Sequence, residues 1–267
     1  MFRNFISPCV SVILAILSLG MSGTAKADYA DDVVSIELLP GWRTDHGTHM
    51  AAVRLTLAPG WKTYWRAPGE GGIPPQMDFE GSRNITAVET HFPTPEVFFA
   101  NGMRSIGYSK VVVLPLEFRV PRPGEARLNA RLDLGICEDI CMPMSVDLRA
   151  TLPSAGARDR AILEALAARP ATFDTPIECA ITPISDGIRM DVTYAAPPGV
   201  STLPVSVVEP GDPTIWMTDT ITEMRGGMIT SSVELVPPRG RPLMLDRSAI
   251  RVTVLGGARG FELRGCD

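Results

Sequence analysis

Cys137 and Cys141 are the residues of this sequence best suited to chemistry. Three residues separate them, and the segments on either side alternate apolar with polar residues. A cysteine thiolate is a nucleophile, and a disulfide between two cysteines is opened when a second thiolate attacks it. The spacing therefore indicates either a thiol–disulfide exchange site or a small structural clip.

The alternation on each side of the pair predicts how it is held. Before the turn the apolar phase is Leu128, Ala130, Leu132, Leu134 and Ile136, and after it Met142, Met144, Val146, Leu148 and Ala150. Both cysteines fall in the opposite phase, so we expect them off the core face. Four steps along a straight strand cover about 13 Å, whereas a disulfide needs Cα atoms within about 6.8 Å. A hairpin turning through residues 138–140 satisfies this limit, and Pro143 disfavours a helix.

The short loop favours a chemical use of the Cys137–Cys141 pair. Closing so small a loop stabilises a fold less than closing a long one. We expect the carboxylates of Glu138 and Asp139 to disfavour a neighbouring thiolate until a partner alters the local field. In contrast, Cys179 and Cys266 bracket the last third of the chain and are expected to form a structural disulfide.

The N-terminus indicates the compartment. Arg3 precedes an apolar run over residues 5–19, and Ala25-Lys26-Ala27 has the form of a cleavage site, so residues 1–27 are expected to be a signal peptide. The mature chain should then lie outside the cytoplasm, without membrane insertion, in a compartment where disulfides persist. The formal net charge of −5 and the lack of a long basic run exclude sequence-independent binding to the phosphates of nucleic acid.

Strand-like runs dominate the chain and predict an all-β fold. With 24 Gly and 24 Pro, the sequence alternates short apolar-polar runs with turns. Helical spacing of apolar residues occurs over residues 154–169 and ends at Pro170. We predict two immunoglobulin-like β-sandwich domains, at 28–153 and 175–267, joined by a short helical linker at 154–174.

Several motifs in the first half resemble the periplasmic N-terminal domain of the DsbD-type thiol:disulfide interchange proteins. In order, the matching segments are residues 60–69 (GWKTYWRAPG), 73–75 (IPP), 98–102 (FFANG), 106–108 (IGY), 113–115 (VLP) and 137–143 (CEDICMP). The resemblance covers about residues 33–152. The second strand-rich half makes the whole more similar to the relatives tied to suppression of copper sensitivity.

The resemblance implies an immunoglobulin-like domain that passes electrons by thiol–disulfide exchange without an organic cofactor. Cys137 and Cys141 match the family's redox pair, and Phe98, Phe99 and Gly102 fall where a cap loop shields it. The implied partners are a membrane-embedded thiol reductant of the DsbD or CcdA type and periplasmic thioredoxin-like proteins. The multi-helix membrane domain and thioredoxin-like domain of the best-known members are absent, so a separate protein should supply the electrons. The Cys-x3-Cys spacing is also tighter, which leaves open which cysteine is attacked first.

Two functions of other classes remain open. Cys137, Cys141, Met142 and Met144 are soft ligands suited to Cu(I), although the alternation points the methionines towards the core. A non-catalytic immunoglobulin-like adaptor would use the cysteine pair as a stabilising clip only.

Other candidate residues are assigned to structure. Trp61, Tyr64, Trp65 and Arg66 are expected to pack in the core and in a rigid corner rather than to bind a ligand. His46 and His49 lack further ligands at metal-site spacing, so no metal site is assigned.

Overall fold

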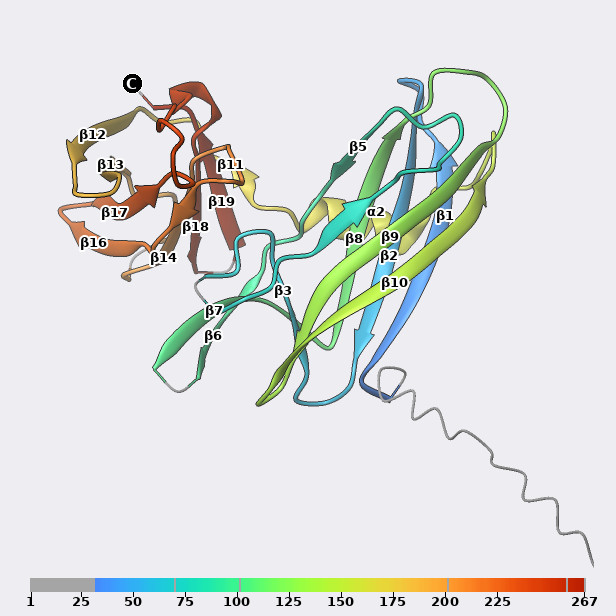
Figure 1. Ribbon diagram of the computed structural model, residues 1–267, viewed down its shortest axis with the longest axis horizontal. Helices are drawn as coiled ribbons and strands as arrows, with labels where there is room; N and C mark the ends of the chain where they lie inside the picture. The colour runs from blue at the N-terminus through green and yellow to red at the C-terminus, as the bar shows by residue number, and fades with distance from the viewer. Residues whose placement is uncertain (1–31, 70, 101, 201, 258, 267) are drawn as a thin grey trace, which may run out of the picture.

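The computed structural model describes residues 32–69, 71–100, 102–200, 202–257 and 259–266. The expected signal peptide, residues 1–27, lies outside this part of the chain. Strands account for most of the described residues, and α2(Arg160–Ala167) is their one α-helix of more than a turn (Figure 1). The all-β prediction is therefore confirmed. No helix of the described residues is long and apolar enough to cross a bilayer.

Two sheets form the N-terminal half. The first has the order β1(Val34–Arg43), β2(Thr48–Leu57), β8(Val111–Arg119), β5(Ala87–Thr90). The second has the order β10(Cys141–Leu152), β9(Ala126–Cys137), β3(Lys62–Tyr64), β7(Met103–Ser109), β6(Glu96–Ala100), and β4(Gln76–Asp78) also pairs with β9. Apolar residues of both sheets meet in one cluster, in which Leu132, Leu116 and Trp65 are fully buried. The alternation along β9 explains this core, since every second residue points between the sheets.

The C-terminal half also has two sheets. One has the order β11(Ala171–Thr172), β19(Arg259–Arg264), β18(Arg251–Gly256), β14(Val205–Glu209). The other has the order β12(Ile177–Pro183), β13(Ile188–Ala195), β17(Met228–Val236), with β15(Trp216–Met217) and β16(Ile221–Arg225) both along β17; a 3-10 turn, η1(Arg247–Ala249), precedes β18. A second apolar cluster lies between these sheets. A disulfide joins Cys179 of β12 to Cys266 after β19, with the two Cα atoms 5.7 Å apart.

Helix α2 is shorter than the predicted span and packs on a sheet. It begins at Arg160 because Oδ1 of Asp159 accepts hydrogen bonds from the backbone N–H groups of Ala161 and Ile162, at 2.8 and 3.2 Å. Ile162 is fully buried in a cluster with Leu39, Trp42, Met50 and Ala52 of β1 and β2. The segment therefore covers the outer face of the first sheet.

A partly buried arginine, Arg66, forms the main ion-paired contact between the two halves. Arg66, just after β3, forms two 2.9 Å bonds to the carboxylate of Glu209 and one of 3.1 Å to Glu262. Its guanidinium also lies 4.2 Å from the centre of the Trp65 ring. Burial acts to lower the pKa of Arg66, but the two carboxylates outweigh it and raise the pKa, so the charge is retained. The interface seen in Figure 1 is thus held by an ion-paired network.

Removal of the two disulfides should have unequal effects on stability. The Cys179–Cys266 bond closes a loop with a sequence separation of 87, and the Cys137–Cys141 bond one of 4. Loop-closure entropy gives a loss of about 4–5 kcal/mol for the double serine variant at Cys179 and Cys266, and about 2 kcal/mol for that at Cys137 and Cys141. Urea unfolding of both variants measures the difference, and equal losses would contradict a structural role for the long-range bond.

Candidate functional site

The hairpin of β9 and β10 holds the cysteine pair at its tip. The antiparallel register sets Cys141 directly opposite Cys137, and the sulfurs are disulfide-bonded with Cα atoms 4.2 Å apart. The tip lies at the lower end of the N-terminal half in Figure 1. The predicted hairpin is confirmed, with residues 138–140 as its turn.

The two cysteines differ in exposure. Cys141 is exposed, whereas Cys137 has only 4% of its surface accessible. The alternation assigns Cys137 to the non-core face but does not reveal that this face is covered. A Cβ added to Gly135, the preceding residue of that face, would lie 2.7 Å from Cβ of Ile73 and 3.0 Å from the Tyr64 ring. Attack from solvent is therefore easier at Cys141.

Tyr64 contacts the disulfide directly. Its hydroxyl lies 3.0 Å from Sγ of Cys141, and burial raises the pKa of the phenol, which therefore stays neutral at physiological pH. The prediction of a packed Tyr64 is correct in burial, at 3% exposed, but incomplete, because the ring lies on the face that carries the cysteines. No local sequence pattern indicates this contact, because it depends on the pairing of β3 with β9, which sets Lys62 opposite Cys137.

The expected cap residues lie on the neighbouring β6–β7 hairpin. Phe98 and Phe99 are in β6, and Gly102 adopts a φ of +78° in the turn. Nζ of Lys62 lies 5.4 Å from the centre of the Phe98 ring, while Phe99 is 74% exposed. Lys62 therefore links Phe98 to the strand beside Cys137, and the capping role remains a prediction.

The soft ligands expected for Cu(I) are on different faces. Met142 and Met144 pack against the core cluster of the N-terminal half. Cys137 and Cys141 are bonded to each other, and Cys141 contacts Tyr64 on the opposite face. The four side chains do not converge on one point.

His46 and His49 differ in their surroundings. His46 is exposed, while His49 is 1% exposed and its Nε2 lies 2.6 Å from the carbonyl oxygen of Pro40. Desolvation by burial lowers the pKa of His49. A buried neutral imidazole bonded to a backbone carbonyl has a structural role.

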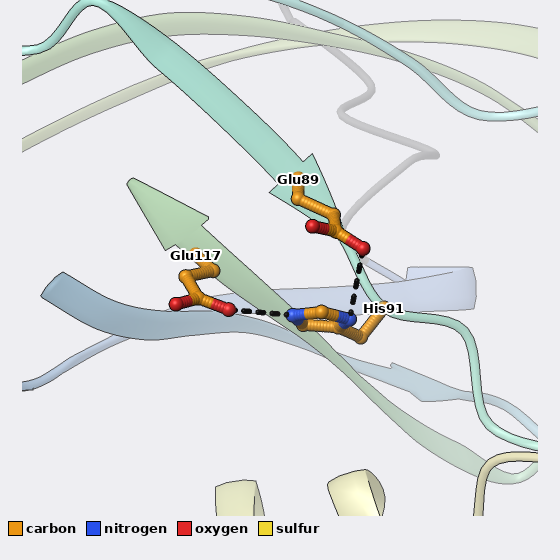
Figure 2. Close-up of side chains that lie close together, drawn as sticks. All are labelled: Glu89, His91 and Glu117. Carbon is orange, nitrogen blue, oxygen red and sulfur yellow. Dashed lines mark hydrogen bonds and ion pairs between the residues drawn. The ribbon is translucent and has the colours of Figure 1, made fainter. Parts of the chain in front are cut away.

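Another histidine lies between two carboxylates (Figure 2). Glu89, His91 and Glu117 could each offer an atom to a metal ion within 4.8 Å of one another. However, the guanidinium of Arg169 lies 3.2 Å from Nδ1 of His91, and Nε2 lies 3.2 Å from Glu117. If Nδ1 accepts from Arg169, Nε2 carries the hydrogen and donates to Glu117. Both ring nitrogens of His91 therefore have hydrogen-bond partners, and the cluster connects β8 to the segment that follows α2.

Comparison with known proteins identifies the class of the first half. Residues 36–153 match the family described as thiol:disulfide interchange protein DsbD, N-terminal. The resemblance read from the motifs is therefore confirmed for this segment. Among curated protein sequences, none is significantly similar to the chain.

The chain as a whole has a fold similar to that of a solved structure. The crystal structure of the N-terminal periplasmic domain of ScsB from Proteus mirabilis superposes with a TM-score of 0.65 at 21% sequence identity. The match covers 87% of this chain and 92% of that one. It therefore extends beyond the family segment into the C-terminal half.

The close packing of Tyr64 and Ile73 over Gly135 allows a test of whether these side chains shield Cys137. We expect Gly135→Ala to push Tyr64 and Ile73 outwards, to lower the unfolding free energy by about 1–3 kcal/mol and to speed reduction of the disulfide by dithiothreitol. Gly71→Ala is the control, because an added Cβ there meets only Sδ of Met103, at 4.0 Å, and neither Gly71 nor Gly135 has a positive φ. An unchanged reduction rate in Gly135→Ala would contradict the shielding of Cys137 by Tyr64 and Ile73.

Burial of His49 predicts a pH dependence of stability. Its folded-state pKa lies below the ordinary 6.5, so the unfolded chain takes up a proton first as the pH falls. The free energy of unfolding therefore includes the full contribution of neutral His49 above about pH 6.5, and this contribution is lost as the pH falls below that value. Urea unfolding at pH 7.5 and 5.5 should show a larger loss for the parent protein than for His49→Gln, and equal losses would contradict the assignment.

Proposed function

We propose that this protein relays electrons by thiol–disulfide exchange through Cys137 and Cys141. The observation that carries the proposal is the asymmetry of the disulfide: Cys141 is exposed and Cys137 is buried. A structural clip needs no such difference, whereas an exchange site needs one sulfur that a partner can reach and one that stays within the protein. The match of residues 36–153 to the N-terminal family of thiol:disulfide interchange proteins supports the same chemistry.

Cys141 is the cysteine that exchanges with partners in this proposal. A donor thiolate attacks Sγ of Cys141, the bond to Cys137 breaks, and Cys137 leaves as a thiolate. A second donor thiolate then attacks the mixed disulfide, which releases the oxidised donor and leaves both cysteines reduced. In the onward step the Cys141 thiolate attacks the acceptor's disulfide, and Cys137 resolves the mixed disulfide. Two electrons thus enter from the donor and two leave to the acceptor, and the pair returns to its oxidised form.

The proposed setting is the periplasm. The match to a periplasmic domain supports it, together with the expected cleavage after residue 27. The donor would be a membrane-embedded thiol reductant and the acceptors thioredoxin-like proteins, and the exchange needs no organic cofactor. We infer two immunoglobulin-like domains, residues 28–153 and 175–267, with residues 154–174 as the helical linker between them. Separate apolar clusters in the two halves support this division.

Single-cysteine variants test the assignment of roles. Cys137→Ser leaves the exposed thiol of Cys141, which should form a mixed disulfide with the oxidised form of a thioredoxin-like protein. Cys141→Ser leaves the covered thiol of Cys137 and should react at least about tenfold more slowly. Non-reducing gels at fixed times measure both rates.

Two results would contradict the proposal. Equal rates for the two variants would remove the assigned roles. If neither variant forms a mixed disulfide while both fold, the pair is a stabilising clip, as the adaptor alternative requires.

A further inference from the structure

Lys62 has an unusual position for a charged side chain. In the register of β3 and β9 it is the direct partner of Cys137, so the two side chains leave the sheet on the same face with Cβ atoms about 5 Å apart. Tyr64, two residues further along β3, contacts Cys141 on this face. The lysine and the disulfide therefore occupy one side of the sheet.

The ammonium group of Lys62 has an aromatic neighbour rather than an anionic one. Its Nζ lies 5.4 Å from the centre of the Phe98 ring. Within the described part of the chain, no carboxylate oxygen lies within 4.0 Å of this nitrogen. A disulfide carries no charge, so the oxidised protein offers the ammonium only the face of the ring.

Opening the disulfide changes the charges on this face. When a thiolate attacks Sγ of Cys141, the electron pair of the broken bond goes to Sγ of Cys137, and a negative charge forms in a nearly buried position. An uncompensated charge in such a position is unfavourable. The Lys62 side chain can reach Cys137 by rotation about its own bonds, since the two residues are neighbours across the strands.

We propose that Lys62 stabilises the thiolate that forms at Cys137 and thereby acts as a positioning residue for the exchange. This inference rests on the proposed function and specifies how the buried sulfur serves as the leaving group. A more stable leaving thiolate departs faster, so the lysine promotes the first step of reduction. Three carboxylates lie near the disulfide: Glu138 and Asp139 in the turn, and Glu96 of β6, which accepts a hydrogen bond from Ser109. Further along this face of β9 and β10, Arg131 and Arg149 each pair with an aspartate of their own strand. The three carboxylates oppose the thiolate, and Lys62 is the cation placed directly across from Cys137.

The first test measures ionisation of Cys137 directly. In the Cys141→Ala background, thiolate absorbance near 240 nm is followed against pH for Lys62, Lys62→Met and Lys62→Arg. We expect Lys62→Met to raise the pKa of the Cys137 thiol by about 0.5–1 unit, and Lys62→Arg to restore it. The control is Arg149→Met on β10, which removes one charge from an exposed position of the same strand, eight residues from Cys141. The same pKa in all four proteins would overturn the proposal.

The second test uses protein with both cysteines, so it does not depend on whether the Cys141→Ala variant folds. Reduction of the disulfide by dithiothreitol should be about two- to threefold slower in Lys62→Met than in the parent or in Arg149→Met. An unchanged rate would overturn the proposal. The proposed relay is judged separately by mixed disulfides with thioredoxin-like proteins. If Lys62→Met slows reduction of the disulfide as expected but no such mixed disulfides form, the relay is refuted and the role of Lys62 stands.

Discussion

The antiparallel register that sets Cys141 opposite Cys137 is the constraint on which the rest of the site depends. It brings two residues that are four apart in sequence to a Cα separation of 4.2 Å, and it places them at the end of a hairpin where one can meet solvent. A shift by one residue would turn the apolar residues of β9 outwards and expose the core, so the packing of this core enforces the register. The geometry of the disulfide is therefore maintained by residues far from the sulfurs.

Strand β3 connects this hairpin to the rest of the molecule. It has only three residues, yet it pairs with β9 on one side and β7 on the other. Lys62 and Tyr64 point to the face of the disulfide, Trp65 enters the core, and Arg66 reaches the carboxylates of the C-terminal half. The segment that covers the cysteine pair thus continues into the contact between the halves. Any movement of β3 during exchange would therefore change both the packing at the disulfide and the contact between the halves.

Local patterns predicted the parts of the structure that depend on local geometry. The hairpin follows from alternation and from the reach of a disulfide, and the strands follow from alternation and turns. Helix α2 begins later than the apolar spacing indicates, because capping by Asp159 sets its start. The covering of Cys137 could not be predicted in this way, since Tyr64 and Ile73 come from more than 60 residues earlier in the chain. The partners of Arg66 are further away still, in the C-terminal half.

A measurement of the reduction potential of the Cys137–Cys141 pair tests the central claim most directly. The mature protein, with the Cys179–Cys266 disulfide intact, is equilibrated in defined thiol buffers, and the fraction of reduced pair is read from the mass added by alkylation. The account predicts a reversible couple between about −180 and −270 mV, the range of exchange-active dithiols. A pair that stays oxidised in buffers poised below about −300 mV would behave as a structural disulfide and would contradict the relay.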